Sequence, residues 1–109
     1  MNILAVDTNN ADLVALVHYI RDRYPQGCVT ACIDPLFAAE FGRRNPVDLL
    51  FAAMQMPDLS GPALDERLRK RVKRLETTFV GEVPELEAPI ARAHGAGYLA
   101  KIALREQAK

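Results

Sequence analysis

The chain has 109 residues and a formal net charge of zero, because 14 Lys and Arg residues balance 14 Asp and Glu residues. This length fits a single domain over residues 1–109, since two independent hydrophobic cores need a longer chain. Half of the residues are hydrophobic, which excludes a disordered tail and a collagen-like chain. The zero net charge argues against a protein whose entire surface binds nucleic acid.

The sequence contains two cysteines, Cys28 and Cys32, which we expect to be reduced thiols that fill a core. On one strand they would lie about 13 Å apart on the same face, too far for a disulfide. No second Cys pair or His cluster completes a zinc site. The sequence has no apolar run long enough to cross a membrane and does not start like a signal peptide, so we expect a cytoplasmic protein with no membrane partner.

The first half of the chain alternates predicted strands and helices. The apolar run 3–6 is typical of a strand buried on both faces. Apolar residues between 13 and 24 then follow the spacing of one helix face, which Asn9 or Asn10 can cap. Residues 28–33 predict a second strand, and Asp34 caps a short helix over 36–41 that Gly42 ends.

The second half continues the alternation. Residues 47–53 predict the most buried strand, and a loop over 54–61 leads to a helix that Pro62 opens. We place Leu64, Leu68, Val72 and Leu75 on the apolar stripe of this helix. A fourth strand over 77–80, a helix over 84–94 that Pro89 shortens or kinks, a fifth strand over 97–100 and a final helix over 102–109 complete the chain.

This alternation predicts an α/β fold, in which helices cover both faces of a five-stranded parallel sheet and the crossovers are right-handed. In such sheets the functional site lies beyond the carboxyl ends of the strands. The residues at these ends are Asp7, Thr8, Ala53, Gly81, Glu82 and Lys101.

Three sequence blocks, spread over nearly the whole chain, resemble the receiver domain of bacterial response regulators. The strongest is DLLFAAMQMPDLSG at residues 48–61, where such receivers read DLVFLDIQMP-x-x-x-G. The others are GYLAKI at 97–102, where the family reads x-Y-L-x-K-P, and VDTN at 6–9, where it has VDDE. Together the blocks most resemble receivers that precede LytTR-type DNA-binding domains. The resemblance implies a flavodoxin-like (CheY-like) fold with strand order 2-1-3-4-5.

The resemblance also implies a phosphorylation pocket, which is degenerate in this chain. In the family an aspartate that ends the third strand accepts a phosphoryl group and binds Mg²⁺ together with two acidic residues after the first strand, while a Ser or Thr and a Lys end the fourth and fifth strands. The matching positions here are Asp7, Thr8, Ala53, Gly81 and Lys101. Mg²⁺ needs hard oxygen ligands, and phosphoryl transfer needs positioning and charge neutralisation. We therefore expect no metal, no cofactor and no catalytic residue.

With no acceptor carboxylate, Lys101 and Asp7 are expected to form an ion pair, directly or through water, rather than to be solvated separately. Asp58 and Glu82 are the candidates for a substitute carboxylate, although solvated loop positions fit both better. We place Asp48 at the start of its strand, away from the site.

These features predict an atypical, phosphorylation-independent receiver of two-component-type signalling, not an enzyme, that serves as an interaction, dimerisation and regulatory module of a transcription regulator. From the resemblance, a protein partner or a second copy would bind the face formed by the fourth helix, fifth strand and fifth helix. This face would include Ile90, Arg92, Tyr98, Leu99 and Arg105. The alternatives are a phosphorylatable receiver that uses a substitute carboxylate, and an unrelated flavodoxin-like enzyme or ligand-binding domain.

The run 66–76 holds six of the fourteen basic residues. It predicts either a patch for nucleic acid, acidic lipid or an acidic partner, or a solvated helix face whose cations suit the helix dipole. No aromatic residues lie within the run, so the second interpretation is favoured and no direct nucleic-acid contact is expected. His18 on an outer helix face and His94 at a helix end need no metal to explain them.

Overall fold

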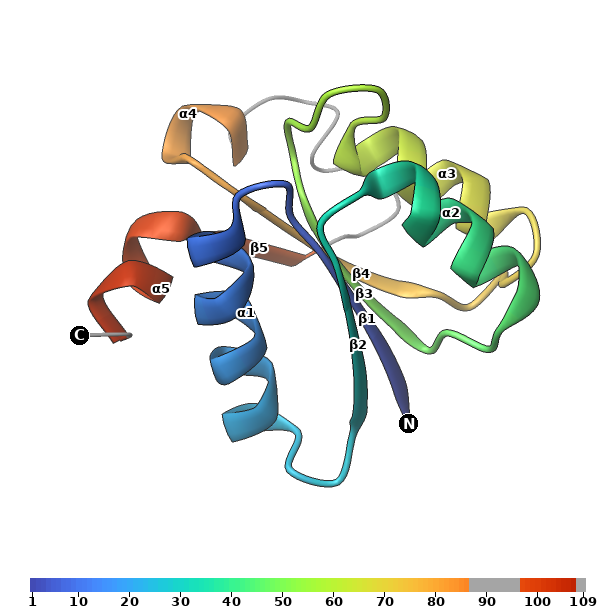
Figure 1. The fold of residues 1–109 in the computed structure, drawn as a ribbon, viewed down its shortest axis with the longest axis horizontal. Helices are drawn as coiled ribbons and strands as arrows, with labels where there is room; N and C mark the ends of the chain where they lie inside the picture. The colour runs from blue at the N-terminus through green and yellow to red at the C-terminus, as the bar shows by residue number, and fades with distance from the viewer. Residues whose placement is uncertain (87–96, 108–109) are drawn as a thin grey trace.

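The computed structural model describes residues 1–86 and 97–107, in which strands and helices alternate along the chain (Figure 1). The strands are β1 (Asn2–Val6), β2 (Cys28–Cys32), β3 (Leu49–Ala53), β4 (Glu76–Gly81) and β5 (Gly97–Ala100). The helices are α1 (Asn10–Arg23), α2 (Pro35–Arg44), α3 (Gly61–Arg69), α4 (Val83–Leu86) and α5 (Lys101–Gln107).

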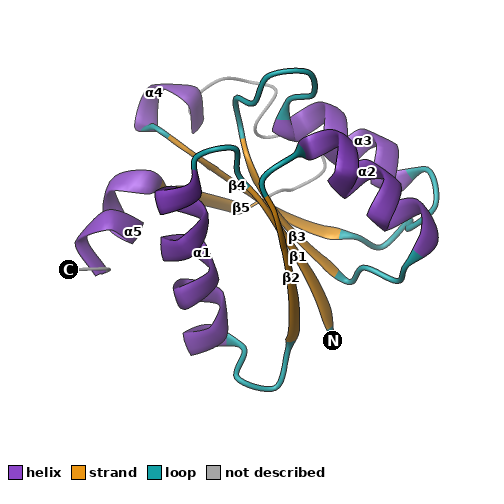
Figure 2. Ribbon diagram, viewed as in Figure 1, coloured by secondary structure: helices purple, strands orange, loops and turns teal. Residues whose placement is uncertain are grey.

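The five strands form one parallel sheet in the order β2-β1-β3-β4-β5. Helices α1 and α5 lie on one side of this sheet, and α2 and α3 lie side by side on the other (Figure 2). The predicted α/β fold and strand order are confirmed. Since all strands run in the same direction, their carboxyl ends meet at one edge, which we call the carboxyl edge.

The hydrophobic core lies on both faces of the central strands. All five residues of β3 are buried, as expected for a strand covered by helices on both faces. Leu50 packs on the side of α2 and α3, together with Leu64, whereas Phe51 packs on the opposite side with Leu16 of α1. Successive residues of the strand therefore serve different helix layers.

Helix α2 continues through Gly42, which we expected to end it. A Cβ atom at Gly42 would lie 2.1 Å from Cδ2 of Leu68, so the glycine allows α3 to approach α2 closely. The helix instead ends at Arg44 and is capped by Asn45, whose N–H donates to the carbonyl of Phe41 at 2.9 Å. Here the absence of a side chain serves packing between two helices rather than helix termination.

Helix α3 is shorter than its apolar stripe predicted. It ends at Arg69, so Val72 and Leu75 lie in the connection to β4. In this connection the N–H of Val72 donates to the carbonyl of Leu68 at 2.9 Å, but that of Leu75 reaches only back to Val72 at 3.3 Å. Val72 and Leu75 still pack against the core, which explains why helical spacing extends past the helix.

The two cysteines lie on β2 as free thiols. Cys32 is buried, and its burial, with the nearby Asp34 carboxylate, raises the pKa of its thiol. Cys28 is exposed, so the expectation that it fills a core is wrong. Pro89 and His94 lie outside the described residues. Among the described helices, none is long and apolar enough to cross a membrane.

Candidate functional site

The residues predicted at the strand ends lie along the carboxyl edge. Asp7 directly follows β1 and is only 1% exposed, and Ala53 ends β3 and is fully buried. Gly81 ends β4 and is buried, whereas Thr8 is exposed to solvent. Lys101 begins α5 directly after β5.

The Asp7 carboxylate faces the Lys101 ammonium. Its Oδ1 accepts a hydrogen bond of 2.9 Å from the N–H of Asn9, and its Oδ2 lies 3.1 Å from Lys101 Nζ. The second contact is an ion pair, and no other polar partner of the buried Oδ2 lies among the described residues. The expected Asp7–Lys101 ion pair is thus direct.

A second carboxylate, which the sequence analysis missed, completes the arrangement. Asp12 lies in the first turn of α1 and is buried. Its Oδ2 accepts a hydrogen bond of 3.1 Å from Lys101 Nζ, and its Oδ1 accepts one of 3.2 Å from Nε of Arg105. The signal was available: Asp12 precedes the fully buried Leu16 by four positions, which places both on the inner face of the helix.

The ion pairs outweigh burial for both charged partners. Burial alone would raise the pKa of Asp12, but hydrogen bonds from Arg105 and Lys101 hold this pKa below its usual value. Burial alone would lower the pKa of Lys101, but the nearby carboxylates of Asp7 and Asp12 raise it. Asp12 and Lys101 are therefore both ionised at neutral pH, and the ammonium lies between the carboxylates of Asp12 and Asp7.

Of the two candidate substitute carboxylates, Glu82 pairs with Arg105 and Asp58 is exposed to solvent. Glu82 lies at the start of the β4–α4 connection, where its Oε1 is 3.0 Å from Nη2 of Arg105. Asp58 is exposed in the β3–α3 loop and has a φ of 70°, which explains why a short polar residue stands there. Asp48 lies at the opposite end of the sheet, as expected, and accepts a hydrogen bond of 2.7 Å from the N–H of Asn2. We call Asp7, Asp12, Glu82, Lys101 and Arg105 the charged network.

The Met54 side chain and the Glu85 carboxylate flank the place where a fourth-strand hydroxyl would stand. A Cβ atom at Gly81 would lie 3.3 Å from Cγ of Met54 and 3.0 Å from Oε1 of Glu85. Met54 packs against Phe79 and Ala100. Met54 is therefore a packing residue, and it leaves little room for a larger residue at position 81.

The oxygen atoms near Asp7 and Ala53 do not fit a magnesium ion. Mg²⁺ requires several oxygen ligands in near-octahedral geometry, and an ammonium group beside a carboxylate competes with it for the same oxygen. Ala53 supplies no side-chain oxygen, and both Asp7 and Asp12 already contact Lys101. In the part of the chain that the structure describes, no group of three or more His, Cys, Asp or Glu side chains is placed to hold a metal.

The predicted interaction face is described in part. Ile90 and Arg92 lie outside the described residues. Tyr98 is 38% exposed, whereas Leu99 packs partly into the core on the α1 side. Arg105 contacts both Asp12 and Glu82 and so belongs to the charged network as well.

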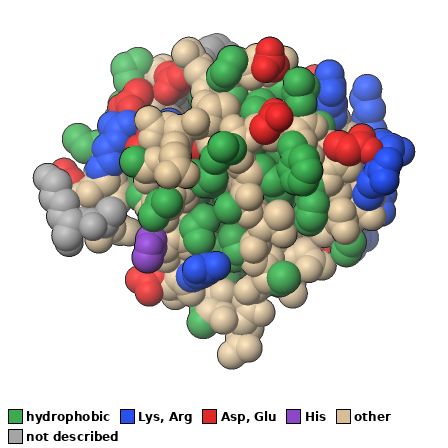
Figure 3. Space-filling model, viewed as in Figure 1, with side chains coloured by type: hydrophobic (Ala, Val, Ile, Leu, Met, Phe, Trp, Pro, Cys, Tyr) green, Lys and Arg blue, Asp and Glu red, His purple; other side chains and the backbone are tan. Residues whose placement is uncertain are grey.

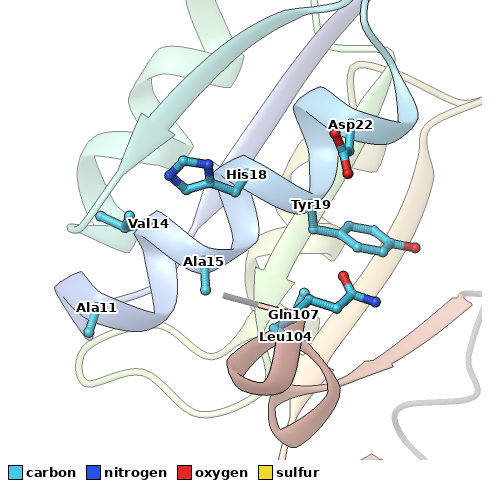
Figure 4. Close-up of a pocket in the computed structure, with 8 residues that line it drawn as sticks. All are labelled: Ala11, Val14, Ala15, His18, Tyr19, Asp22, Leu104 and Gln107. Carbon is cyan, nitrogen blue, oxygen red and sulfur yellow. The ribbon is translucent and has the colours of Figure 1, made fainter. Parts of the chain in front are cut away.

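Two surface depressions lie near these residues. One at the carboxyl edge is formed by Gln55, Met56, Pro57 and Ser60 and is wide open to solvent. The other lies between α1 and α5, where Leu104 and Gln107 of α5 face Ala15 of α1 (Figure 4). His18 lines this second depression and is exposed, as predicted.

The basic run does not follow a single helix. Because α3 ends at Arg69, the basic residues from 70 to 74 lie beyond the helix. The interpretation as a solvated helix face placed them on the helix and its carboxyl end, and the structure does not. Arg71 donates from Nη1 to the carbonyls of Gly42 at 2.7 Å and Asn45 at 3.0 Å. It therefore stabilises the carboxyl end of α2, where unpaired carbonyls attract a cation.

Comparisons with known proteins match the fold but not the sequence. No protein-family model matches the chain, and no curated protein matches it. Solved structures do match. A response regulator receiver domain protein from Clostridium thermocellum is 20% identical, with a TM-score of 0.74 over 96% of this chain and 91% of that one.

Two further solved structures have a similar identity, TM-score and coverage. A two component transcriptional regulator AraC from Clostridium phytofermentans is 18% identical, with a TM-score of 0.82 over 99% of this chain and 88% of that one. The receiver domain of a sensor histidine kinase from Pseudomonas aeruginosa, which holds a magnesium ion in its active site cleft, is 18% identical, with a TM-score of 0.75 over 97% and 92% of the two chains. The chain thus has the fold of the CheY-like receiver domains, with their five-stranded parallel sheet in the order 2-1-3-4-5.

Proposed function

We propose that this domain is a phosphorylation-independent receiver, which acts in two-component-type signalling as a regulatory interaction module rather than as an enzyme. The observation that carries the proposal is the pairing of Lys101 with Asp7 beside a fully buried Ala53. A phosphoryl acceptor needs a nucleophilic oxygen, and the methyl group of Ala53 has none. The lysine that would neutralise a phosphoryl group instead neutralises two carboxylates of the chain itself.

The charged network supports a single constitutive arrangement of the carboxyl edge. Lys101 and Arg105 connect α5 to Asp12 of α1, and Arg105 also reaches Glu82 after β4. In a phosphorylated receiver the incoming negative charge would compete for these cations. In this chain the cations are satisfied without it, so the arrangement does not depend on a phosphodonor.

Incubation with acetyl phosphate and Mg²⁺, followed by intact-mass measurement, tests this proposal. We expect no mass gain under conditions in which an ordinary receiver gains one phosphoryl group. A stable gain of one phosphoryl group would contradict the proposal. Asp58→Asn and Glu82→Gln would then identify whether either carboxylate accepts the group, which is the prediction of the alternative function.

The interaction surface that we propose is the face of α4, β5 and α5, for a protein partner or a second copy. Each of these elements contributes one apolar side chain that is exposed in the described structure: Val83 at 50%, Tyr98 at 38% and Ile102 at 56%. Exposed apolar side chains at one face favour association. The attachment to a LytTR-type effector and the cytoplasmic location remain predictions from the sequence.

Sedimentation of the wild type and of two matched variants tests this surface. Ile102→Glu places a charge on the proposed face, and Val14→Glu places one on an exposed apolar position of α1 that is 49% exposed. If the protein self-associates, we expect Ile102→Glu to weaken the dimer and Val14→Glu to leave it unchanged. A dimer that only Val14→Glu disrupts would contradict the proposed face.

A further inference from the structure

The α2–α3 side of the sheet carries a groove that contains none of the carboxyl-edge residues described above. Helices α2 and α3 lie side by side, and between them is a depression of about 390 Å³. Leu36, Ala39 and Leu68 give it an apolar floor, and Arg43, Arg67 and Lys70 form its rim. We call these six residues the α2–α3 groove. We propose that the groove binds an acidic, amphipathic polypeptide segment of a partner protein.

The position of the groove is set by Gly42. The missing side chain at this position brings Leu68 of α3 against the backbone of α2, so the two helices are close enough to share one depression. Arg71 also connects the end of α3 to the last carbonyls of α2. The groove is therefore a fixed feature of the packing between two helices, which favours binding because little ordering is required.

The rim has an excess of positive charge. Four of the residues that line the depression are basic, Arg43, Arg67, Lys70 and Arg71, and one, Glu40, is acidic. Figure 3 shows Lys and Arg side chains gathered at the end of the molecule where α2 and α3 lie. Since the whole chain has zero net charge, this local excess would attract an acidic surface and repel a basic one.

One acidic side chain interrupts the basic rim. Glu40 of α2 lines the groove and bonds Arg43 at 2.6 Å and Arg44 at 2.7 Å, and these hydrogen bonds lower its pKa to about 2. The positive charges available to a partner are therefore concentrated on α3 and the residues after it. A continuous phosphate backbone would pass the ionised Glu40, which disfavours nucleic acid as the occupant.

The other end of the groove is apolar. Leu36, which lines the groove at the start of α2, is 46% exposed. Ile33 and Phe37 lie next to it in the chain, outside the lining of the groove, and are 57% and 60% exposed. A partner must therefore satisfy apolar contacts at the start of α2 and positive charges at the end of α3. A helix with leucine-like residues on one face and acidic residues beside them has this combination, as in other helix-in-groove complexes.

The groove does not use the charged network, so this inference is independent of the proposed phosphorylation-independent function. The test uses the ¹⁵N-labelled protein and a synthetic helical peptide of about 16 residues, long enough to be partly helical, with Leu on one face and Glu on the other. Two control peptides replace all Glu by Lys or all Leu by Ser. We expect the Leu/Glu peptide to shift amide signals of α2 and α3 and both control peptides to bind at least about tenfold more weakly.

The matched variants carry two charge reversals each. We expect Arg67→Glu with Lys70→Glu to weaken binding by about tenfold or more, because long-range attraction becomes repulsion. Arg21→Glu with Arg23→Glu changes the same charge at the exposed end of α1 and should leave binding unchanged. Thermal unfolding followed by circular dichroism establishes that all variants are folded.

Three outcomes would overturn the proposal. The first is that the Leu/Glu peptide does not bind. The second is that its binding maps to α4, β5 and α5, or that it binds the Arg67→Glu/Lys70→Glu variant as tightly as the wild type. The third is that single-stranded DNA or phosphatidylserine vesicles bind to the same basic residues more tightly than the Leu/Glu peptide does, and that Leu36→Ser does not weaken this binding. That result would assign the groove to a phosphate-bearing ligand. Binding of the Leu/Glu peptide that weakens in both Leu36→Ser and the charge-reversal variant would support it.

Discussion

The Lys101 ammonium lies 3.1 Å from Oδ2 of Asp7, so the first side chain of α5 neutralises the buried carboxylate that follows β1. The same ammonium bonds Asp12 at 3.1 Å. A cation held between two buried carboxylates is difficult to remove, because both would remain in a poorly solvated environment without it.

We therefore expect Lys101→Met to reduce the free energy of unfolding at pH 7 by about 3 kcal/mol. Methionine keeps most of the length of the side chain and removes its charge. In Asp7→Asn/Lys101→Met the loss should be smaller than the sum of the two single losses, since the unpaired Asp7 carboxylate is gone. Urea unfolding of the four proteins measures this cycle, and strictly additive losses would contradict a direct interaction.

The pKa of Asp12 predicts how stability depends on pH. A folded-state pKa below the ordinary value of 3.8 stabilises the protein above that pH, and the contribution is lost as the pH falls through the folded-state pKa. Asp12→Asn should therefore be less stable than the wild type at pH 7, and the difference should shrink below about pH 4. Urea unfolding at a series of pH values measures both.

Glu40→Gln is the control for this pH dependence. The pKa of Glu40 is lowered to about 2 by hydrogen bonds from Arg43 and Arg44, but all three side chains are exposed. Exposed ion pairs contribute little to stability, so we expect almost no change at any pH. A difference between wild type and Asp12→Asn that stays constant down to pH 2 would contradict the role of Asp12.

A third buried carboxylate holds α3 against β4. Asp65 is 1% exposed, pairs with Arg69 at 3.0 Å and accepts a short hydrogen bond from the hydroxyl of Thr77. We expect Thr77→Val to cost about 2 kcal/mol, because the hydrogen bond to a charged acceptor is lost. Thr78→Val, at the neighbouring position of β4, should change the free energy of unfolding by less than about 0.5 kcal/mol. Equal losses would contradict the pairing.

The contact between Gly42 and Leu68 predicts that Gly42→Ala changes stability in opposite directions with and without the Leu68 side chain. Alanine favours a helix over glycine by about 1 kcal/mol, yet its Cβ would lie 2.1 Å from Cδ2 of Leu68. We expect Gly42→Ala to destabilise the wild type by about 1–3 kcal/mol through overpacking. In a Leu68→Ala background the same substitution should stabilise the protein. Thermal unfolding measures both effects, and destabilisation in both backgrounds would contradict this explanation.

The sheet could be predicted because each strand leaves a local signal. Runs of apolar residues such as 3–6 and 49–53 are long enough for buried strands and too short for helices, and turn-forming residues separate them. The ends of α2 and α3 could not be predicted in the same way. Gly42 follows the pattern of a helix terminator, and only the approach of Leu68 explains why the helix continues.

The charged network was predictable only in part. Asp7 and Lys101 follow strands, so parallel topology alone brings them to one edge. Asp12 lies on a helix, where an acidic residue in the first turn is ordinarily explained by the helix dipole. Its pairing with Lys101 and Arg105 depends on α1 and α5 covering the same face of the sheet, which is a property of the packed structure.

The hydrogen bonds to Asp12 connect residues that are 89 and 93 positions apart in the chain. Contacts of such long sequence separation form late, because the chain between them must first be ordered. We therefore expect the amino-terminal carboxylates to stay hydrated through the early steps of folding, until α5 docks. Mutations at Lys101 should consequently accelerate unfolding far more than they slow refolding.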